Sequence, residues 1–564
     1  MISELNPGLI LIMGALLIPL LPRFFCGPYM IALPVVALIY MLNLPIGEFG
    51  HIQLFDMQLV TLRVDKLSLA FGYVFLIAVF VGTIYSLHLD DWAQHASGMV
   101  YAGSAIGAAF AGDLITLFVF WELTAVSSVF LIWASRTAAS RHAGQRYLVI
   151  QICSGLILLS GIMLHFRESG SILFNAIGIE TIPGQLILIA FGVKCAFPLL
   201  NSWLQDSYPH ATITGAVLLS AFTTKLAVYA IARGYAGTDY LIPIGAMMAI
   251  LPLFLAVIEN DMRRLLAHAL NNQLGFMVVG VGIGTELALN GVAAHAFCHI
   301  IYKGILFMAV GAVMLRYGTA KASELGGLCR AMPCTFALCM LGAASISFPF
   351  FSSFVAKSLI LSAALKGEHF IAWMALLTAS AGVFLVCGLR LPYAIFGGTK
   401  PEKLKVLREV PLNMFFAMVI SAVLCIAIGI YYTPLYDVLP YIVKYNPYTL
   451  EHILVQLQLL TFSTLAFVIT MRSGVLPTLK KSTVLDTEWI YRKVGYNFFA
   501  TTGCMIQKTW KVASEDAKNI VMSLEILLKK MHSKDEGLGQ SFSTGRMVFY
   551  VVVVLVGYLC LFYF

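Results

Sequence analysis

Long apolar segments recur from one end of the chain to the other, with short polar or Gly/Pro-containing breaks between them. An apolar run of roughly 18 residues or more can cross ~30 Å of hydrocarbon as a helix. The breaks predict about sixteen spans, with approximate limits at 8–25, 28–45, 66–88, 96–112, 113–134, 145–166, 183–204, 209–233, 240–259, 264–283, 289–315, 332–365, 369–396, 410–432, 451–471 and 546–564. The pattern therefore predicts an all-α polytopic membrane protein.

Composition excludes a soluble protein. Of the 564 residues 60% are hydrophobic and 11% charged, whereas soluble domains carry about 25% charged residues. The eleven cysteines form no CxxC pair, so neither an iron–sulfur framework nor haem attachment is predicted. No glycine-rich nucleotide motif is present either. We therefore expect no cofactor in this chain, and any redox or ATP chemistry would belong to partners.

The net charge of +8 indicates how the chain is oriented in the membrane, because basic residues are distributed unequally between its loops. Basic residues gather in the loops that follow odd-numbered spans, namely Arg136, Arg141, Arg146, Arg263, Arg264, Arg316, Lys321, Arg330, Lys400, Lys403, Lys405, Arg408, Arg472, Lys480 and Lys481. Because such loops face the cytoplasm, the N-terminus is predicted to lie outside it. The N-terminus has no basic region, so the first span is expected to be retained rather than cleaved.

Two spans contain a similar proline phrase, FPLLNSW from Phe197 and FPFFSSF from Phe348, 151 residues apart. They are spans seven and twelve, so corresponding segments would cross the membrane in opposite directions. Broken helices at matching positions of inverted halves are typical of a transport path. The alternative is that each proline only kinks a packed helix.

Five ionisable residues lie inside predicted spans: Glu122, Lys194, Lys225, Lys303 and Lys357. A charge at the centre of a span costs ~2.5–3.5 kcal/mol on insertion scales, which makes such residues functional candidates. Glu122 and Lys194 have opposite signs in nearby spans, so we expect them to pair; the alternative is a static ion pair that fixes packing. The other lysines have no carboxylate of their own.

A stripe of titratable residues follows in AAHAFCHIIYKG, where His295, His299 and Lys303 occur at i, i+4 and i+8. This spacing places them on one helix face and predicts a proton relay, because histidine exchanges protons near neutral pH. Asp206, His210 and His268 are candidate polar residues of half-channels, although such groups also satisfy opened backbone. No cluster of intramembrane carboxylates is available for a metal or cation site.

These segments resemble the antiporter-like subunits shared by respiratory complex I, membrane-bound hydrogenases and multisubunit cation/proton (Mrp-type) antiporters. The matching phrases are FWEL, FGVK, TTKLAVYAIAR, DMRRLLAHALNNQLGF, HAFCHIIYKGILF and MPCTFALCMLGAASISFPFFSSFVAK, in order over roughly 110–400. The resemblance implies about 14 to 16 transmembrane helices with two inverted five-helix repeats containing broken helices. It also implies that Glu122 modulates Lys194, that Lys225 and the histidines connect the halves, and that Lys303 and Lys357 lead to the exit.

Some positions depart from that family. Its HxWLPxAHPxAP phrase appears here as NSWLQDSYPHAT, with Asn201, Gln205 and Tyr208 at the family's His, Pro and His positions. Lys225 is similar to the lysine of D-type Mrp subunits, whereas the tail is similar to that of the longest complex I subunit.

Five regions are predicted: N-terminal transmembrane helices at 1–112, an antiporter-like proton-translocating core at 113–400, C-terminal transmembrane helices at 401–481, a cytoplasmic amphipathic surface helix at 482–545 and a final transmembrane helix at 546–564. Apolar residues of the surface helix, among them Ile520, Leu524 and Leu528, recur at helical spacing. Gly495 and Gly503 argue against one unbroken helix over the whole tail.

The predicted function is a proton-conducting membrane subunit of a multisubunit Na⁺/H⁺ antiporter, closest to the D-type Mrp subunits, in a bacterial inner membrane. The alternatives are a proton-pumping subunit of an NADH-quinone oxidoreductase or a hydrogenase-type complex, and a proton-driven solute-uptake complex. Expected partners are other membrane subunits, the lipid bilayer, protons and, as a further candidate, Na⁺, with no nucleic acid. A passive scaffold gives no reason to retain five buried charges.

Overall fold

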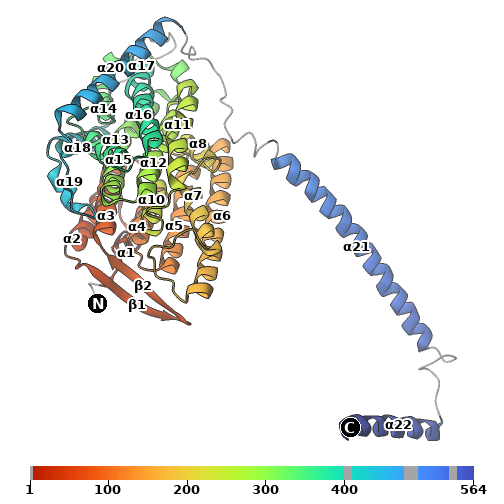
Figure 1. The fold of residues 1–564 in the computed structure, drawn as a ribbon. Coiled ribbons are helices and arrows are strands. Elements are labelled where there is room, and N and C mark those ends of the chain that lie inside the picture. The colour runs from red at the N-terminus through yellow and green to blue at the C-terminus, as the bar shows by residue number, and fades with distance from the viewer. Residues whose placement is uncertain (1–3, 399–408, 475–492, 494, 533–542, 564) are drawn as a thin grey trace. The chain divides into compact units, whose positions relative to one another are not determined.

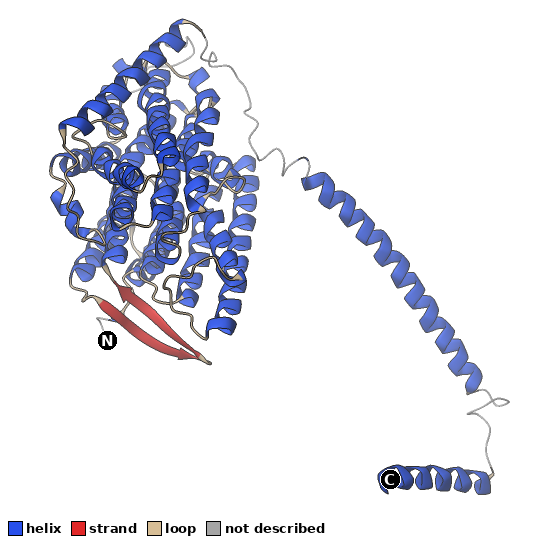
Figure 2. Cartoon of the chain, in the orientation of Figure 1, coloured by secondary structure: helices blue, strands red, loops and turns tan. Residues whose placement is uncertain are grey.

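The computed structural model describes residues 4–398, 409–474, 493, 495–532 and 543–563. The chain forms two compact units, Met1–Asp486 and Thr487–Phe564. The first unit is a bundle of helices with a two-stranded antiparallel hairpin at one end (Figures 1 and 2).

The N-terminal half of the first unit follows the predicted spans closely. Its helices are α1 (Gly8–Leu17), α2 (Arg23–Leu42), α3 (Lys66–Ser86), α4 (Trp92–Ala109), α5 (Leu114–Trp133), α6 (Ala138–Ser169), α7 (Ile182–Cys195), α8 (Ser202–Ser207), α9 (Ile213–Ala221) and α10 (Thr223–Gly234), with short 3₁₀ turns at Ile18–Leu20 and Tyr208–His210. The predicted break within span seven is present as residues 196–201, between α7 and α8.

The C-terminal half contains the second broken helix. Its helices are α11 (Leu241–Ile258), α12 (Met262–Ile283), α13 (Glu286–Tyr317), α14 (Pro333–Ala344), α15 (Ser352–Lys366), α16 (Phe370–Val383), the π-helical turn η6 (Phe384–Arg390), α17 (Leu391–Phe396), α18 (Leu412–Ile430), α19 (Thr433–Val438) and α20 (Leu450–Arg472), with 3₁₀ turns at Ala322–Glu324 and Leu328–Arg330. Residues 345–351 interrupt the second proline-containing span as predicted.

Among the described residues, twelve helices are long and apolar enough to cross a membrane. Three shorter apolar helices, Gly8–Leu20, Ile182–Cys195 and Pro333–Ala344, accompany them. The expectation of an all-helical multi-pass membrane protein is confirmed. Predicted span eight is present as one candidate span, Ile213–Gly234, which consists of α9 and α10. The two helices meet at Phe222, with φ of −102° and ψ of −68° and no proline nearby.

The hairpin was not predicted. Strands β1 (Gly47–Leu54) and β2 (Met57–Val64) pair antiparallel around a turn at Phe55 with φ of +51°. Asp65 then starts α3 through a capping box with Ser68 and forms an ion pair of 2.7 Å with Arg233 of α10. Burial opposes ionisation of this carboxyl, but Arg233 and the Ser68 amide outweigh it and lower the pKa of Asp65.

The second unit contains α21 (Tyr496–Met531) and α22 (Thr544–Tyr563). No side chain of either helix is buried. α21 begins after Gly495 and continues through Gly503. Residues 482–492 of the predicted surface-helix region lie outside the described residues, so the expectation about one helix over the whole tail stays a prediction. The region boundaries predicted at 400/401 and 481/482, and six basic residues of the loop pattern from Lys400 to Arg408 and at 480 and 481, lie outside the described residues.

Candidate functional site

Lys194 ends α7 directly before the break and is fully buried. Its Nζ donates to the Trp121 carbonyl at 2.5 Å and to Thr124 Oγ1 at 3.0 Å, both on α5. It also lies 4.3 Å from the centre of a Trp121 ring, which is a cation–π distance. The ammonium is thus solvated by the backbone and aromatic face of the neighbouring helix.

Glu122, the next residue of α5 after Trp121, interacts electrostatically with Lys194. The two groups do not form the direct ion pair that was expected, since no N–O distance between them is within 4.0 Å. Glu122 Oε1 is buried and has no hydrogen-bond partner among the described residues. A Cβ at Gly155 of α6 would overlap this carboxylate, so the glycine leaves the space that Glu122 occupies.

Lys225 lies in the first turn of α10, just after the break at Phe222. Its buried Nζ donates to the Ser220 carbonyl at 2.6 Å and to Thr224 Oγ1 at 3.3 Å. The side chain of Lys225 therefore satisfies a carbonyl in the last turn of α9, where the regular helix stops.

His295 and His299 lie on one face of α13, as their spacing predicted, with ring centroids 5.9 Å apart and nearly parallel planes. Their four ring nitrogens are buried and have no hydrogen-bond partner in the described part of the chain. Lys225, Lys303 and Lys357 are all close enough to His299 to interact with it electrostatically. The histidine pair therefore lies within electrostatic range of a lysine from the first half, Lys225, and of two lysines from the second half, Lys303 and Lys357.

Lys303 is buried one turn beyond His299, and its Nζ contacts Cys387 Sγ at 3.7 Å. Cys387 belongs to the π-helical turn η6, and single π turns are frequent at functional sites. Lys357 of α15 donates to the Ile346 carbonyl at 3.1 Å, inside the second break. Its Nζ lies 5.1 Å from the Phe276 ring centre, and Phe276 in turn contacts His295.

Each of the four buried lysines has at least one polar contact from the surrounding protein. Lys225 and Lys357 bind carbonyls at helix breaks, Lys303 binds a side chain of a π turn, and Lys194 leaves the helix end beside a break to bind α5. A buried amine without such partners would cost several kcal/mol. Helix irregularities therefore provide the polar partners of Lys225, Lys303 and Lys357, whereas the regular helix α5 provides those of Lys194.

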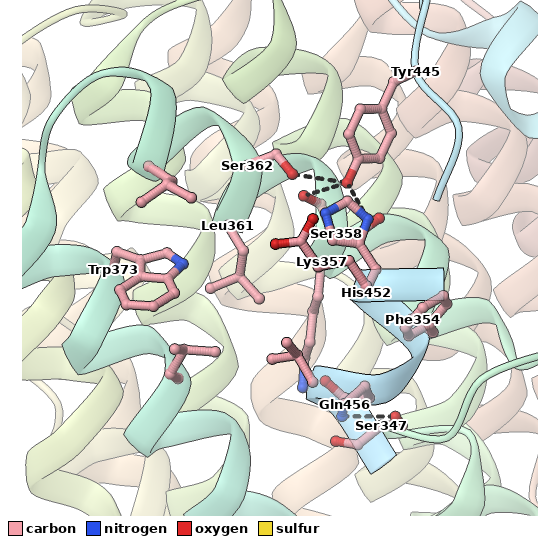
Figure 3. Close-up of a pocket in the computed structure, with 14 residues that line it drawn as sticks. Ser347, Phe354, Lys357, Ser358, Leu361, Ser362, Trp373, Tyr445, His452 and Gln456 are labelled. Atoms are coloured by element: carbon pink, nitrogen blue, oxygen red, sulfur yellow. Dashed lines mark hydrogen bonds between the residues drawn. The ribbon is translucent and has the colours of Figure 1, made fainter. Parts of the chain in front are cut away.

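A cavity of about 130 Å³ adjoins Lys357 (Figure 3). We name it the Tyr445 cavity; it is lined by Ser347, Phe354, Lys357, Ser358, Leu361, Ser362, Leu365, Trp373, Leu377, Tyr445, Glu451, His452, Val455 and Gln456. Figure 3 shows Tyr445, Ser362 and His452 together at one end, whereas Gln456 and Ser347 lie near the tip of Lys357. Gln456 Nε2 donates to the Ser347 carbonyl at 2.8 Å, so α20 satisfies the carbonyl next to the one that Lys357 binds.

A second cavity of about 380 Å³ lies by the 3₁₀ turn after α8. We name it the Arg263 cavity; it is lined by His88, Leu89, Gln94, Ser135, Thr137, Pro209, His210, Ala211, Thr212, Ile213, Thr214, Arg263, Met314 and Leu315. A space of about 20 Å³ shares Leu89, Gln94 and Thr214 with it and extends to His95 and Leu218. Leu218 is two residues from Ser220, whose carbonyl binds Lys225.

The two cavities lie at opposite ends of α13. Asn290, near the start of α13, exchanges hydrogen bonds with Tyr441 in the loop that carries Tyr445. Met314, near the end of the same helix, contacts Arg263. The row of lysines and histidines occupies the part of the bundle between them.

The three candidate half-channel residues have different surroundings. Asp206 is buried and bound by Arg146 through two hydrogen bonds, at 2.7 and 2.9 Å, and its place in a half-channel stays a prediction. His210 lines the Arg263 cavity, and burial, opposed by Asp206, lowers its pKa. His268 is buried in α12.

The sequence pattern did not single out several side chains of this region. Tyr445 and His452 lie in a predicted loop and at a predicted span start, and Cys387 belongs to no predicted motif. Arg390, inside predicted span thirteen, is buried and donates to the Ala256 and Glu259 carbonyls. The rule that intramembrane charges deserve notice would have found Arg390. No sequence signal marks the others.

Comparison with known proteins gives related results for sequence and fold. Residues 111–383 match the family described as "NADH:quinone oxidoreductase/Mrp antiporter, TM". Hydrogenase-4 component B of Escherichia coli is 26% identical over 67% of this chain and 63% of its own length. The A-type subunit of the Na(+)/H(+) antiporter of Alkalihalophilus pseudofirmus is 27% identical over 76% of this chain and 60% of its own length. The chain thus spans about 60% of the length of these curated relatives.

Two solved structures share the fold. One is the Mrp complex from Dietzia sp. DQ12-45-1b, with a TM-score of 0.68 and 20% identity, covering 83% of this chain and 99% of that chain. The other is the membrane-bound sulfane sulfur reductase (MBS), an archaeal respiratory membrane complex, with a TM-score of 0.71 and 19% identity, covering 98% of this chain and 99% of that chain. The segment that matches this family model, residues 111–383, contains Glu122, the four buried lysines and both histidines.

Proposed function

We propose that this chain is a proton-conducting membrane subunit of a multisubunit cation/proton antiporter or a related complex. Protons would pass along Lys194, Lys225, the histidine pair, Lys303 and Lys357, with Glu122 modulating Lys194. The observation that carries the proposal is the series of buried titratable groups between two cavities, with unpartnered histidine nitrogens at its centre in the described part of the chain. Buried polar atoms of this kind are normally satisfied by water, and water between titratable groups carries protons.

The loop charges give this path a direction in the membrane. If basic loops face the cytoplasm, the Arg263 cavity opens toward the cytoplasm and the Tyr445 cavity toward the outside. Two cavities that do not meet allow protons to enter on one side and leave on the other only through the titratable row. That arrangement couples proton movement to the charge states of the lysines.

The relatives support two kinds of complex. The A-type subunit of a Na(+)/H(+) antiporter favours cation exchange, whereas hydrogenase-4 component B, together with the fold shared with MBS, favours a second candidate, the proton-pumping arm of a redox complex. Similarity to the D-type Mrp subunits and a bacterial inner-membrane location stay predictions. Mass spectrometry of the proteins that copurify in mild detergent separates the two: small hydrophobic antiporter subunits support exchange, and subunits with iron–sulfur, flavin or metal sites support the redox arm.

Substitution of the central lysines tests proton conduction. Lys225→Ala and Lys303→Ala are expected to reduce proton transport by native complexes in proteoliposomes by at least about tenfold, with normal assembly. The matched control is Lys321→Ala, which removes an exposed loop lysine and should leave transport within about twofold. Unchanged transport in both central variants would overturn the proposal.

A further inference from the structure

The end of the Tyr445 cavity that is remote from the Lys357 amine carries a hydrogen-bonded chain of three side chains. Tyr445 Oη lies 2.7 Å from Ser362 Oγ and 3.2 Å from His452 Nδ1. The tyrosine and imidazole rings are tilted by 31°, with centroids 5.8 Å apart. Figure 3 shows the three groups converging on the tyrosine hydroxyl.

We propose that His452 is the proton-exchanging group at the outer mouth of the path and that Tyr445 is the hydroxyl that connects it to Lys357. This inference rests on the proposed function, because it assigns the last step of the same path. The residues come from three separate elements: α15, the loop after α19, and the first turn of α20.

The cavity provides the connection between Lys357 and this chain. Ser358 and Ser362 follow Lys357 on α15, and five residues of helix advance about 7.5 Å. The Tyr445 cavity, which Lys357, Ser358 and Ser362 all line, measures about 130 Å³. This volume holds several water molecules. Lys357 itself is held at the opposite end by the Ile346 carbonyl. A proton leaving its ammonium therefore has a polar route along one helix face.

Each transfer conserves atoms and charge. Lys357 loses a proton and becomes a neutral amine, and the proton reaches Tyr445 through cavity water or the Ser362 hydroxyl. Tyr445 accepts it while passing its own hydroxyl proton to Nδ1 of neutral His452. The resulting imidazolium releases the proton on Nε2 to outside water. Burial raises the pKa of Tyr445 against the opposing hydrogen bonds with Ser362 and with Ser358, whose carbonyl accepts from the tyrosine at 3.3 Å, so the hydroxyl keeps a proton to pass on.

Glu451, the charged residue next to His452, is a weaker candidate for the proton-exchanging group at the mouth of the path. Glu451 lines the same cavity, but no hydrogen bond among the described residues joins it to Tyr445 or Ser362. His452, by contrast, is half-buried and fixed at both ends: its amide donates to Thr449 Oγ1 at 3.3 Å and its ring meets Tyr445. Imidazole is also the side chain that exchanges protons near neutral pH.

The test uses native complexes in proteoliposomes that carry His452→Ala, His452→Gln, Tyr445→Phe or Lys357→Ala. The control is His369→Ala, a half-buried histidine in the same predicted outer region that does not line the Tyr445 cavity. We expect proton transport to fall at least about fivefold in the His452 and Tyr445 variants. Imidazole added outside should restore transport to His452→Ala, because it replaces the missing base, and should not restore it to Lys357→Ala.

The outcomes distinguish the two proposals. Loss of transport in Lys357→Ala with control-level transport in His452→Gln and Tyr445→Phe would overturn the assignment of the mouth while the proposed function stands. A loss in His452→Ala that imidazole does not rescue, in normally assembled complexes, would overturn it too, since it indicates a packing role. Full transport in Lys357→Ala would overturn the proposed function itself.

Discussion

The two broken helices share one backbone plan and carry different chemistry. The interval of 151 residues that relates their proline phrases also relates Lys194 to Ser345 and Asp206 to Lys357. In the first half the carboxylate after the break, Asp206, forms an ion pair with Arg146. The lysine of that half, Lys194, precedes the break. In the second half the lysine follows the break and adjoins a cavity. The repeat therefore sets where the helix opens, and individual side chains decide which opening exchanges protons.

The local partners show the same contrast. At the first break the Trp203 indole donates to the Val193 carbonyl at 2.9 Å, so a packed aromatic group caps the broken helix. At the second break Lys357 and Gln456 cap consecutive carbonyls at Ile346 and Ser347. An indole cap cannot change its charge, whereas an amine cap can. The second break is thus the one whose stability depends on the protonation of the path.

The largest expected difference comes from removing the two related residues. Lys357→Ala should lower proton transport in proteoliposomes about 100-fold, while Asp206→Ala should leave it within about twofold. Asp206→Ala should instead lower the free energy of unfolding by about 1 kcal/mol. Arg146 loses its partner, but water can solvate its partly exposed side chain, so the loss is small.

Two further variants check this prediction. Lys366→Ala, at the exposed end of the same helix as Lys357, should behave as the parent protein. Adding Arg146→Ala to Asp206→Ala should restore part of the lost stability if the pair is structural. A strong transport loss in Asp206→Ala with unchanged stability would place Asp206 in the path and remove the contrast.

A smaller effect is expected at the Glu122 end of the row. Gly155→Ala places a methyl group where the Glu122 carboxylate lies, so the carboxylate must move relative to Lys194. We expect proton transport to fall about three- to tenfold with modest loss of stability. Gly503→Ala in α21, where a Cβ meets nothing, is the control. Transport equal to that control would mean that the Glu122 position does not influence Lys194.

The smallest effect concerns the pH dependence of stability at the Arg263 cavity. Because burial lowers the pKa of His210, the folded state favours the neutral ring, and the unfolded state binds more protons below its ordinary value of ~6.5. The stabilisation is complete above that pH and is lost as the pH falls. His210→Gln should therefore flatten the acid limb of a thermal unfolding series between about pH 7.5 and about pH 5. If the variant lost stability with falling pH as steeply as the parent protein, this account would be contradicted.

Much of the fold could be predicted because a membrane span has a simple sequence code. Apolar length located helices such as α12 and α18 to within about two residues, and Pro198 and Pro349 marked two breaks. The break at Phe222 could not be predicted, since tertiary contacts cause it. Tyr101 of α4 accepts a hydrogen bond from the Thr223 amide at 3.0 Å, and Lys225 binds the Ser220 carbonyl. By contrast, η6 ends two residues before Pro392, which has no amide to donate to the carbonyl of Gly388 within this turn.

Three properties could be read directly from the residues: the chain crosses a membrane many times, two of its spans are broken, and certain charges lie within spans. Each follows from apolar length, proline or insertion cost, which act locally along the chain. Helix packing was needed to establish that Asp206 is neutralised by Arg146, that Glu122 lacks a direct partner among the described residues, and that Tyr445 and His452 meet near Lys357. Hydrogen bonds and ion pairs act over a few ångströms, and the residues that form them here are brought together from distant parts of the chain.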